Sequence, residues 1–430
     1  MKFSLVNLGC KVNRVEADSI GAALLAAGWE AVDGDADVAI VNTCTVTAEA
    51  DRKTRKEVNR ALARNEGAPV IVTGCAAAVD PDAYRALSPL VRVVAKGNVV
   101  QECFALGPHD SQSGKARFGH SLLCPVGPAT EVVEARGAPA LLRVGEDFPT
   151  RVGVKVQDGC NNACTYCIVH VARGKATSAP LEQVADEVAS YGRAGVREVV
   201  LTGIDLGAYA YQGFSLADLV VRLRAAAPET RLRISSIEPV TIDDALVEVL
   251  ATQEGMVCRH LHVPLQSGSS KVLHDMARRY DAECYLEVVD SLRDAIPGLS
   301  LTTDVIVGFP GETDQDFNDT MELAQACGFS RMHLFRYSKR EGTPAAARLD
   351  QVTPQVKAER MARLSALADD LRLADAKSRL GTTERILVES DECAMSESYY
   401  EVKTAAALER GSLVEARLSG YDEKDGTFYL

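Results

Sequence analysis

Apolar and polar residues alternate over the first hundred residues in a way that predicts short strands, each followed by an amphipathic helix. KFSLVNLGC (2–10) and ADVAIVNTC (36–44) each precede a long helical pattern, and APVIVTGC (68–75) precedes a shorter one. Alternating strands and helices are typical of a parallel sheet with helices on its faces. We therefore predict an α/β domain, with an N-terminal parallel sheet, over residues 1–105.

A second alternating series begins near residue 149, after a stretch (106–148) that is rich in Gly, Pro and Ser and is predicted to be a linker. Its strand candidates are VGVKVQ, EVVLTG, RLRISSIEP, HLHVPLQS, LTTDVIVGFP and RMHLFRYS. Six such units predict a partial (β/α)6 TIM-like barrel with a trailing helix over residues 149–376, whose active site lies at the carboxyl ends of the strands.

The last segment, residues 377–430, contains only short apolar runs separated by polar turns, which predicts a small all-β domain. The full length of 430 residues suits about three domains of roughly 150 residues. No apolar run approaches the roughly 20 residues of a membrane-spanning helix, and the first residues carry no signal-peptide pattern. We expect a cytoplasmic protein with no membrane partner.

The net charge of −13 means that any nucleic-acid partner must be held by local basic patches. One candidate patch, Arg52, Lys53 and Lys56, lies on the helix predicted after the second strand. The other, Arg336, Lys339 and Arg340, follows the sixth barrel strand. An ordinary solvated helix surface is the competing interpretation of the first patch.

Three of the twelve cysteines form a tight cluster, C-x3-C-x2-C, directly after the first barrel strand: Cys160, Cys164 and Cys167. Three thiolates on one loop can ligate three irons of a [4Fe–4S] cluster and leave the fourth iron open for another ligand. A structural zinc site would need a fourth ligand, which His170 could supply, so zinc is the alternative.

Three further cysteines, Cys10, Cys44 and Cys75, each end a predicted strand of the N-terminal domain. The carboxyl ends of parallel strands meet at one edge of a sheet, so these thiols could converge on a second iron–sulfur cluster. Three buried core cysteines are the competing interpretation, and spacing alone leaves it open.

The C-x3-C-x2-C motif on a partial barrel resembles the radical S-adenosylmethionine superfamily. The combination of NLGC, NTC and TGC, this barrel and a terminal β module is similar to the methylthiotransferases, over nearly the whole chain. GCKVN and NTCTVT are similar to the branch that acts on N6-threonylcarbamoyladenosine in tRNA. The resemblance implies two [4Fe–4S] clusters, S-adenosylmethionine as cofactor, and a TRAM-like last domain.

The implied activity is methylthiolation of C2 of N6-threonylcarbamoyladenosine at position 37 of tRNA. One S-adenosylmethionine would donate the methyl group and a second would yield a 5′-deoxyadenosyl radical. The alternatives are methylthiolation of isopentenyladenosine or of a ribosomal protein aspartate, and, in another class, a non-catalytic iron–sulfur redox protein. The resemblance also implies an electron donor of the flavodoxin or ferredoxin type, and we expect a monomer.

Polar strand ends supply the residues that the resemblance assigns to the cofactor, although polar strand ends are common in barrels. The expected cofactor-binding residues are Tyr166, Thr202, Gly203, Ser236, Glu238, Gln266, Asp304 and Tyr337. We assign no general acid or base, because the cofactors carry the demanding chemistry in such enzymes.

Two features depart from the family pattern. His170 stands where the family generally has proline. The segment 381–430 carries five Lys or Arg against eleven Asp or Glu, a net charge of −6, which argues against a role of the last domain in gripping RNA.

Overall fold

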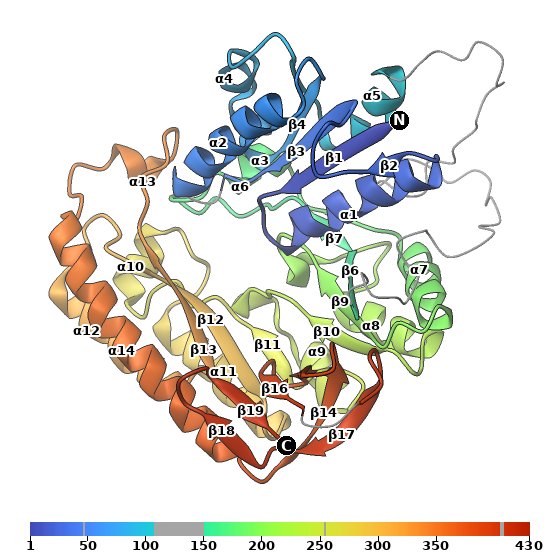
Figure 1. Ribbon diagram of the computed structural model, residues 1–430. Helices are drawn as coiled ribbons and strands as arrows, with labels where there is room; N and C mark the ends of the chain where they lie inside the picture. Colours follow the sequence, from blue (N-terminus) through green and yellow to red (C-terminus); the bar gives the residue numbers. More distant parts are fainter. Residues whose placement is uncertain (46–47, 107–149, 253–254, 405–407) are drawn as a thin grey trace. The chain divides into compact units, whose positions relative to one another are not determined.

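The computed structural model describes residues 1–45, 48–106, 150–252, 255–404 and 408–430 (Figure 1). The described chain divides into two compact units. The first holds the residues up to 106 together with Gly159–Asn161 and Ile168–Lys175, and the second holds the remaining described residues. Most of the predicted linker, 107–148, lies outside the described residues.

A parallel sheet forms the first unit, as the alternating pattern predicts. Its strands pair in the order β2-β1-β3-β4-β5. The strands are β1 (Lys2–Asn7), β2 (Glu30–Ala31), β3 (Val38–Thr43), β4 (Val70–Gly74) and β5 (Val91–Val93). The helices are α1 (Lys11–Ala26), α2 (Ala48–Arg64), α3 (Cys75–Val79), α4 (Pro81–Arg85), α5 (Val99–Leu106) and α6 (Val169–Arg173).

Helices cover both faces of this sheet. On one face Ile20 of α1 and Val99 of α5 pack against Phe3 and Ile40, and on the other Val58 of α2 packs against Val41. The central strand β3 is buried along its whole length, which explains why its sequence, VAIVNT, shows no alternation of apolar and polar residues.

The second unit contains the six strands of an open barrel, as predicted. Along the chain they are β6, β9, β10, β11, β12 and β13. The first three form one parallel ladder and the last three form another, and single parallel bridges link the two groups. The strands are β6 (Arg151–Lys155), β9 (Glu198–Thr202), β10 (Arg231–Ile234), β11 (His260–His262), β12 (Ser300–Val307) and β13 (Arg331–Arg336), and a short β7 (Gln157–Asp158) pairs with β8 (Thr177–Ser178).

Helices α7 to α14 follow or flank these strands in the sequence. They are α7 (Leu181–Arg193), α8 (Leu216–Ala226), α9 (Asp244–Thr252), α10 (Ser270–Asp275), α11 (Ala282–Ala295), α12 (Asp314–Cys327), α13 (Pro344–Ala347) and α14 (Pro354–Arg379). Among the helices of the described residues, none combines the length and the hydropathy that a membrane span requires.

The C-terminal module is the all-β element that the short apolar runs predict. Its strands pair in the order β17-β14-β15-β16-β19-β18. They are β14 (Thr383–Val388), β15 (Cys393–Ser396), β16 (Glu401–Lys403), β17 (Leu413–Arg417), β18 (Gly420–Asp422) and β19 (Thr427–Tyr429). Ala376 of α14 packs into the core of this module against Ile386, Tyr400 and Phe428, so the trailing helix joins the module to the barrel.

Buried charges fasten the module to the amino ends of the barrel strands. Glu198 at the start of β9 pairs with Arg231 at 2.5 Å and Arg233 at 2.8 Å. All three side chains are at most 1% exposed, and burial would raise the pKa of Glu198, but the two guanidinium groups hold it at about 2. Each arginine also donates to carbonyl oxygens of the module, Arg231 to Arg385 and Arg233 to Ser396.

Tyr399, in the turn between β15 and β16, lies against the same residues. Its ring centroid is 4.8 Å from the Arg233 guanidinium carbon and 4.7 Å from the centroid of the His260 ring, and its φ of 71° is a conformation that residues other than glycine rarely adopt. The module therefore packs against the amino ends of β9, β10 and β11. The carboxyl ends, where barrel active sites form, point the other way.

Candidate iron–sulfur and cofactor site

Cys10, Cys44 and Cys75 follow the carboxyl ends of β1, β3 and β4, which are neighbours in the parallel sheet. The pairing of Asn7 with Asn42 and of Thr43 with Gly74 brings these three strand ends level. Cys10 is exposed, whereas Cys44 and Cys75 are buried, and none of the three forms a disulfide with another described cysteine.

Asn13 links two of these cysteines. Its side-chain oxygen lies 3.7 Å from the Cys10 sulfur and 3.9 Å from the Cys75 sulfur, and its amide nitrogen donates to the Thr43 carbonyl at 2.8 Å. Asn13 was not among the predicted site residues, although it is the last residue of the GCKVN motif. The buried Asn13 side chain therefore lies next to the residues that follow β1 and β4 and to the last residue of β3.

Two basic side chains surround Cys75. Nε of Arg173 lies 3.3 Å and Nζ of Lys96 lies 3.5 Å from its sulfur. The side chain of Arg173 is 1% exposed, and it also donates to Asn13 at 2.6 Å and pairs with Glu16 at 3.0 Å. Positive charge beside a thiol favours the thiolate, the form that binds metals.

These residues fit an iron–sulfur cluster. The donor set is thiol sulfur, the soft ligand that iron–sulfur clusters take, and the guanidinium and ammonium groups offset the negative charge that such a cluster brings. The alternative of three core cysteines does not explain an exposed Cys10 or two cations directed at Cys75.

The second cysteine set lies in the loop between β7 and α6. The Cys160 amide donates to the Gly174 carbonyl at 3.1 Å, and the Cys167 amide donates to the Cys164 carbonyl at 3.0 Å. A Cβ on Gly159 would lie 2.1 Å from the Lys175 carbonyl oxygen, so the loop requires glycine directly before Cys160. His170, in α6, is exposed.

Arg278 lies beside Cys164, with Nη1 3.3 Å from the sulfur, and forms an ion pair with Glu238. Its guanidinium carbon also lies 5.0 Å from the centroid of the Tyr280 ring. Nothing in the sequence pattern marks Arg278, because Cys164 and Glu238 lie far from it along the chain. Glu238, expected to bind the cofactor, is thus held by a cation that also contacts a predicted cluster ligand.

Other residues expected to bind the cofactor lie after the barrel strands. Thr202 is buried at the end of β9, and a Cβ on the next residue, Gly203, would lie 2.9 Å from Oε1 of Gln157. That oxygen accepts from the amides of Ile204 and Asp205, which holds the turn in shape.

Ser236 and Gln266 follow neighbouring strands. Ser236 bridges to His262, and Gln266, with a φ of 66°, bridges to Val305. Tyr166 and Tyr337 instead pack together with Phe309 in an apolar cluster, and burial raises the pKa of Tyr166.

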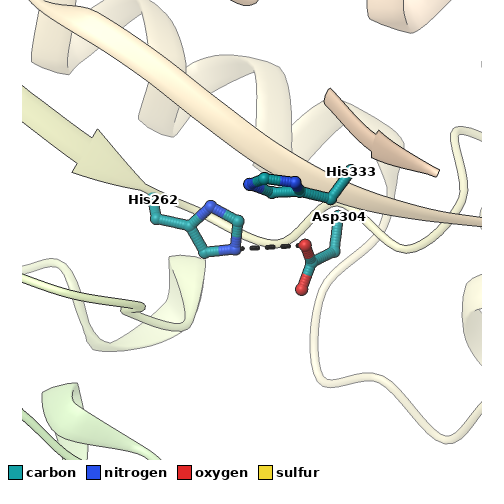
Figure 2. Close-up of side chains that lie close together, drawn as sticks. All are labelled: His262, Asp304 and His333. Atoms are coloured by element: carbon teal, nitrogen blue, oxygen red, sulfur yellow. Dashed lines mark ion pairs between the residues drawn. The ribbon is translucent and has the colours of Figure 1, made fainter. Parts of the chain in front are cut away.

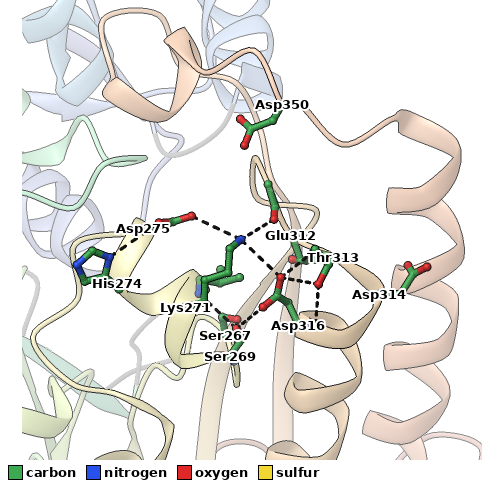
Figure 3. A network of polar contacts seen from close by, with 12 residues as sticks. Ser267, Ser269, Lys271, His274, Asp275, Glu312, Thr313, Asp314, Asp316 and Asp350 are labelled. Carbon is green, nitrogen blue, oxygen red and sulfur yellow. Dashed lines mark hydrogen bonds and ion pairs between the residues drawn. The ribbon is translucent and has the colours of Figure 1, made fainter.

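The loops after β11 and β12 bond mainly to each other (Figure 3). Asp316 accepts from Ser269 at 2.6 Å and from Thr313 at 2.7 Å, and Lys271 donates to the Gly311 carbonyl at 2.6 Å. Thr313 also caps α12. Many polar side chains of the SGS and GFPGET segments therefore form hydrogen bonds that hold the two loops in place.

The predicted RNA-binding residues divide by exposure. Arg52, Lys53 and Lys56 are exposed on one side of α2, and Arg336 and Lys339 are exposed at and after the end of β13. Arg340 is only 8% exposed, and its carbonyl oxygen accepts from Thr343.

The barrel interior holds a cluster that the sequence did not indicate: His262, Asp304 and His333, from three adjacent strands. Figure 2 shows the side chains directed toward one another. Nε2 of His262 lies 3.3 Å from Oδ1 of Asp304, and the centroids of the two imidazole rings are 5.7 Å apart. Only the strand pairing reveals the cluster, because its members are far apart in the sequence.

Comparisons with known proteins agree with this architecture. Residues 154–324 match the model of the radical SAM superfamily, and residues 2–96 match an uncharacterized family, UPF0004. A solved radical S-adenosylmethionine methyltransferase, TsrM from Kitasatospora setae, shares the fold with a TM-score of 0.55 and 18% identity, over 80% of this chain and 74% of that one.

Two curated relatives are more similar in sequence. The threonylcarbamoyladenosine tRNA methylthiotransferase MtaB of Bacillus subtilis is 40% identical over 85% of this chain and 79% of its own. The tRNA-2-methylthio-N(6)-dimethylallyladenosine synthase of the same organism is 34% identical over 91% of this chain and 76% of its own. The chain therefore belongs to the methylthiotransferase family of radical S-adenosylmethionine enzymes.

Proposed function

We propose that this enzyme methylthiolates C2 of N6-threonylcarbamoyladenosine at position 37 of tRNA, in the cytoplasm. The observation that carries the proposal is the presence of two cysteine sets, one at the carboxyl ends of β1, β3 and β4 and one in the loop after β7. Greater identity to the MtaB relative than to the dimethylallyladenosine synthase supports the choice of substrate.

Each cysteine set has one part in this reaction. Cys160, Cys164 and Cys167 would hold a cluster that binds S-adenosylmethionine, and Cys10, Cys44 and Cys75 would hold an auxiliary cluster for the sulfur. When bound, these groups supply a 5′-deoxyadenosyl radical, a methyl group and sulfur. The protein's own residues would position these groups and balance their charge, and we assign none of them as a general acid or base.

The residues around both sets supply those charges. Arg173 and Lys96 lie beside the Cys75 sulfur and Arg278 lies beside the Cys164 sulfur, where these cations would offset the negative charge of a bound cluster.

The barrel residues would hold S-adenosylmethionine. Thr202, Gly203, Ser236 and Gln266 lie at or after the carboxyl ends of their strands, where barrel enzymes bind their ligands. Glu238, held by Arg278, would accept from the cofactor. Tyr166 and Tyr337 would form an apolar support.

The exposed cations of the two patches are our candidates for phosphate contacts: Arg52, Lys53, Lys56, Arg336 and Lys339. We also propose that the enzyme acts as a monomer and takes electrons from a flavodoxin or ferredoxin. The proposed domain division remains 1–105, 106–148, 149–376 and 377–430.

Nucleoside analysis of tRNA from a strain that lacks this gene tests the substrate. We expect the 2-methylthio group to disappear from threonylcarbamoyladenosine and to remain on isopentenyladenosine, with restoration by the wild-type gene. Loss from isopentenyladenosine alone would assign the enzyme to the other branch, and unchanged tRNA would contradict the proposal.

A further inference from the structure

His262, Asp304 and His333 face the same side of the barrel sheet. Asp304 is paired in register with His333, and His262 is paired with Thr302, two residues before Asp304. Because side chains two residues apart on a strand share a face, all three lie on one face of the sheet. Their ligand atoms lie within 4.8 Å of one another, and each residue is only partly buried.

A chain of polar contacts holds His262 in place. Nδ1 of His262 lies 2.9 Å from Oγ1 of Thr302, and Nε2 of His260 lies 3.2 Å from the same hydroxyl. With the Thr302 hydroxyl donating to Nδ1, the other ring nitrogen of His262 carries its proton toward Asp304. This arrangement orients the ring as outer hydrogen bonds commonly orient a functional histidine.

Phe335 stands two residues beyond His333 on β13 and on the same face of the strand. It is 38% exposed, unusual for a large apolar ring within a barrel strand. Enzymes that act on a nucleobase stack the extruded base on aromatic rings of this kind. Two residues of strand span about 6.6 Å, so a base stacked on Phe335 would direct a substituent toward His333.

We propose that His262, Asp304 and His333 form the subsite for the threonylcarbamoyl group of the substrate base, a proposal that rests on the proposed function. Asp304 then contacts the substrate rather than S-adenosylmethionine. The threonylcarbamoyl group carries a carboxylate, a hydroxyl and a urea. The His333 imidazole can donate to its carboxylate, and the Asp304 carboxylate, which His262 orients, can accept from a hydroxyl or urea N–H. An isopentenyl group offers no such partners and would remove water from these polar side chains without giving them new hydrogen bonds.

Two histidines and a carboxylate can also bind a divalent metal. The contacts favour the polar substituent, because Thr302 and Asp304 already face both ring nitrogens of His262, whereas a metal would take the nitrogen that pairs with Asp304. The exposed Phe335 is explained by a base and not by a metal.

The test compares two anticodon stem-loop RNAs, one with N6-threonylcarbamoyladenosine and one with isopentenyladenosine, on the reconstituted holoenzyme. We expect His333→Phe to lower kcat/KM for the threonylcarbamoyl RNA, and to weaken its binding, at least about tenfold. S-adenosylmethionine cleavage without RNA should stay at the wild-type rate. His274→Phe is the matched control, since the His274 side chain is 92% exposed.

The outcomes separate this inference from the proposed function. The inference alone would be overturned if the wild type modifies the threonylcarbamoyl RNA and the His333→Phe and smaller His333→Asn variants keep its preference for that RNA over the isopentenyl RNA. A wild type that modifies only the isopentenyl RNA would overturn the proposed function. One equivalent of zinc or manganese in the wild type, lost in His333→Phe, would overturn the inference in favour of a metal site.

Discussion

Arg173 connects α6, the helix that follows the C-x3-C-x2-C motif, with the auxiliary cysteines. Its buried guanidinium contacts Asn13, Glu16 and Cys75, and all of these residues belong to the first unit. A single side chain therefore joins a segment next to one cysteine set with the ligands proposed for the other.

We expect Arg173→Met to change the electron paramagnetic resonance signal and the midpoint potential of the auxiliary cluster, because it removes the positive charge 3.3 Å from the Cys75 sulfur. Arg173→Lys should restore part of the wild-type signal. Arg14→Met is the matched control, since the Arg14 side chain is 66% exposed. A wild-type spectrum in Arg173→Met would show that Arg173 has only a packing role.

Cys44 tests whether the dispersed cysteines are ligands. Cys44→Ala should lower the iron content of the reconstituted enzyme from about eight per chain toward about four, while S-adenosylmethionine cleavage continues. Cys103→Ala is the matched control: Cys103 is fully buried in α5, and burial raises the pKa of its thiol to about 12. Equal iron in wild type and Cys44→Ala would refute the auxiliary cluster as assigned.

The cysteines could be predicted from the sequence because each set carries its own spacing or strand-end position. Asn13, Arg173, Arg278 and His333 could not, since their roles depend on contacts between segments far apart in the chain. Arg278, for example, lies 114 residues from Cys164.

At the level of secondary structure, the buried Glu198 group decides how the C-terminal module is attached. Glu198→Gln would leave two buried guanidinium groups without their counter-ion. Breaking such a pair costs about 3 kcal/mol or more, so we expect a clear fall in the free energy of unfolding. Glu229→Gln, in an exposed pair with Arg197, should change it little. Equal stability of the two variants would contradict this role of Glu198.

The buried Glu198 carboxylate also predicts that the stability of the fold depends on pH. The pKa of Glu198 falls from 4.5 to about 2 on folding. A lowered pKa stabilises the fold above pH 4.5, and this contribution is lost as the pH falls toward 2. The difference in melting temperature between wild type and Glu198→Gln should therefore narrow over that range. A difference that stays constant down to pH 2 would contradict the assigned pKa.

The six barrel strands could be predicted from the alternation of strands and helices along the chain, but the placement of the C-terminal module could not. Arg231 and Arg233 alternate with apolar residues in RLRI, and both are buried, because Glu198 and carbonyl oxygens of the module pair with them. A sequence pattern shows whether a strand or helix is amphipathic, but it does not show which other segment of the chain packs against it.

At the scale of the whole molecule, charge and architecture agree on where RNA should not bind. The module with a net charge of −6 packs against the amino ends of β9, β10 and β11, away from the carboxyl ends of the barrel strands. In this chain the module covers one end of the barrel, and we propose that the exposed cations of α2 and of the segment after β13 contact the phosphates.

The most direct test of the central claim is mass spectrometry of a stem-loop RNA with N6-threonylcarbamoyladenosine, after reaction with the reconstituted enzyme and S-adenosylmethionine labelled with a trideuterated methyl group. We expect a C2 methylthio group that carries the labelled methyl, together with 5′-deoxyadenosine. Formation of 5′-deoxyadenosine with no methylthio group on this RNA would contradict the claim.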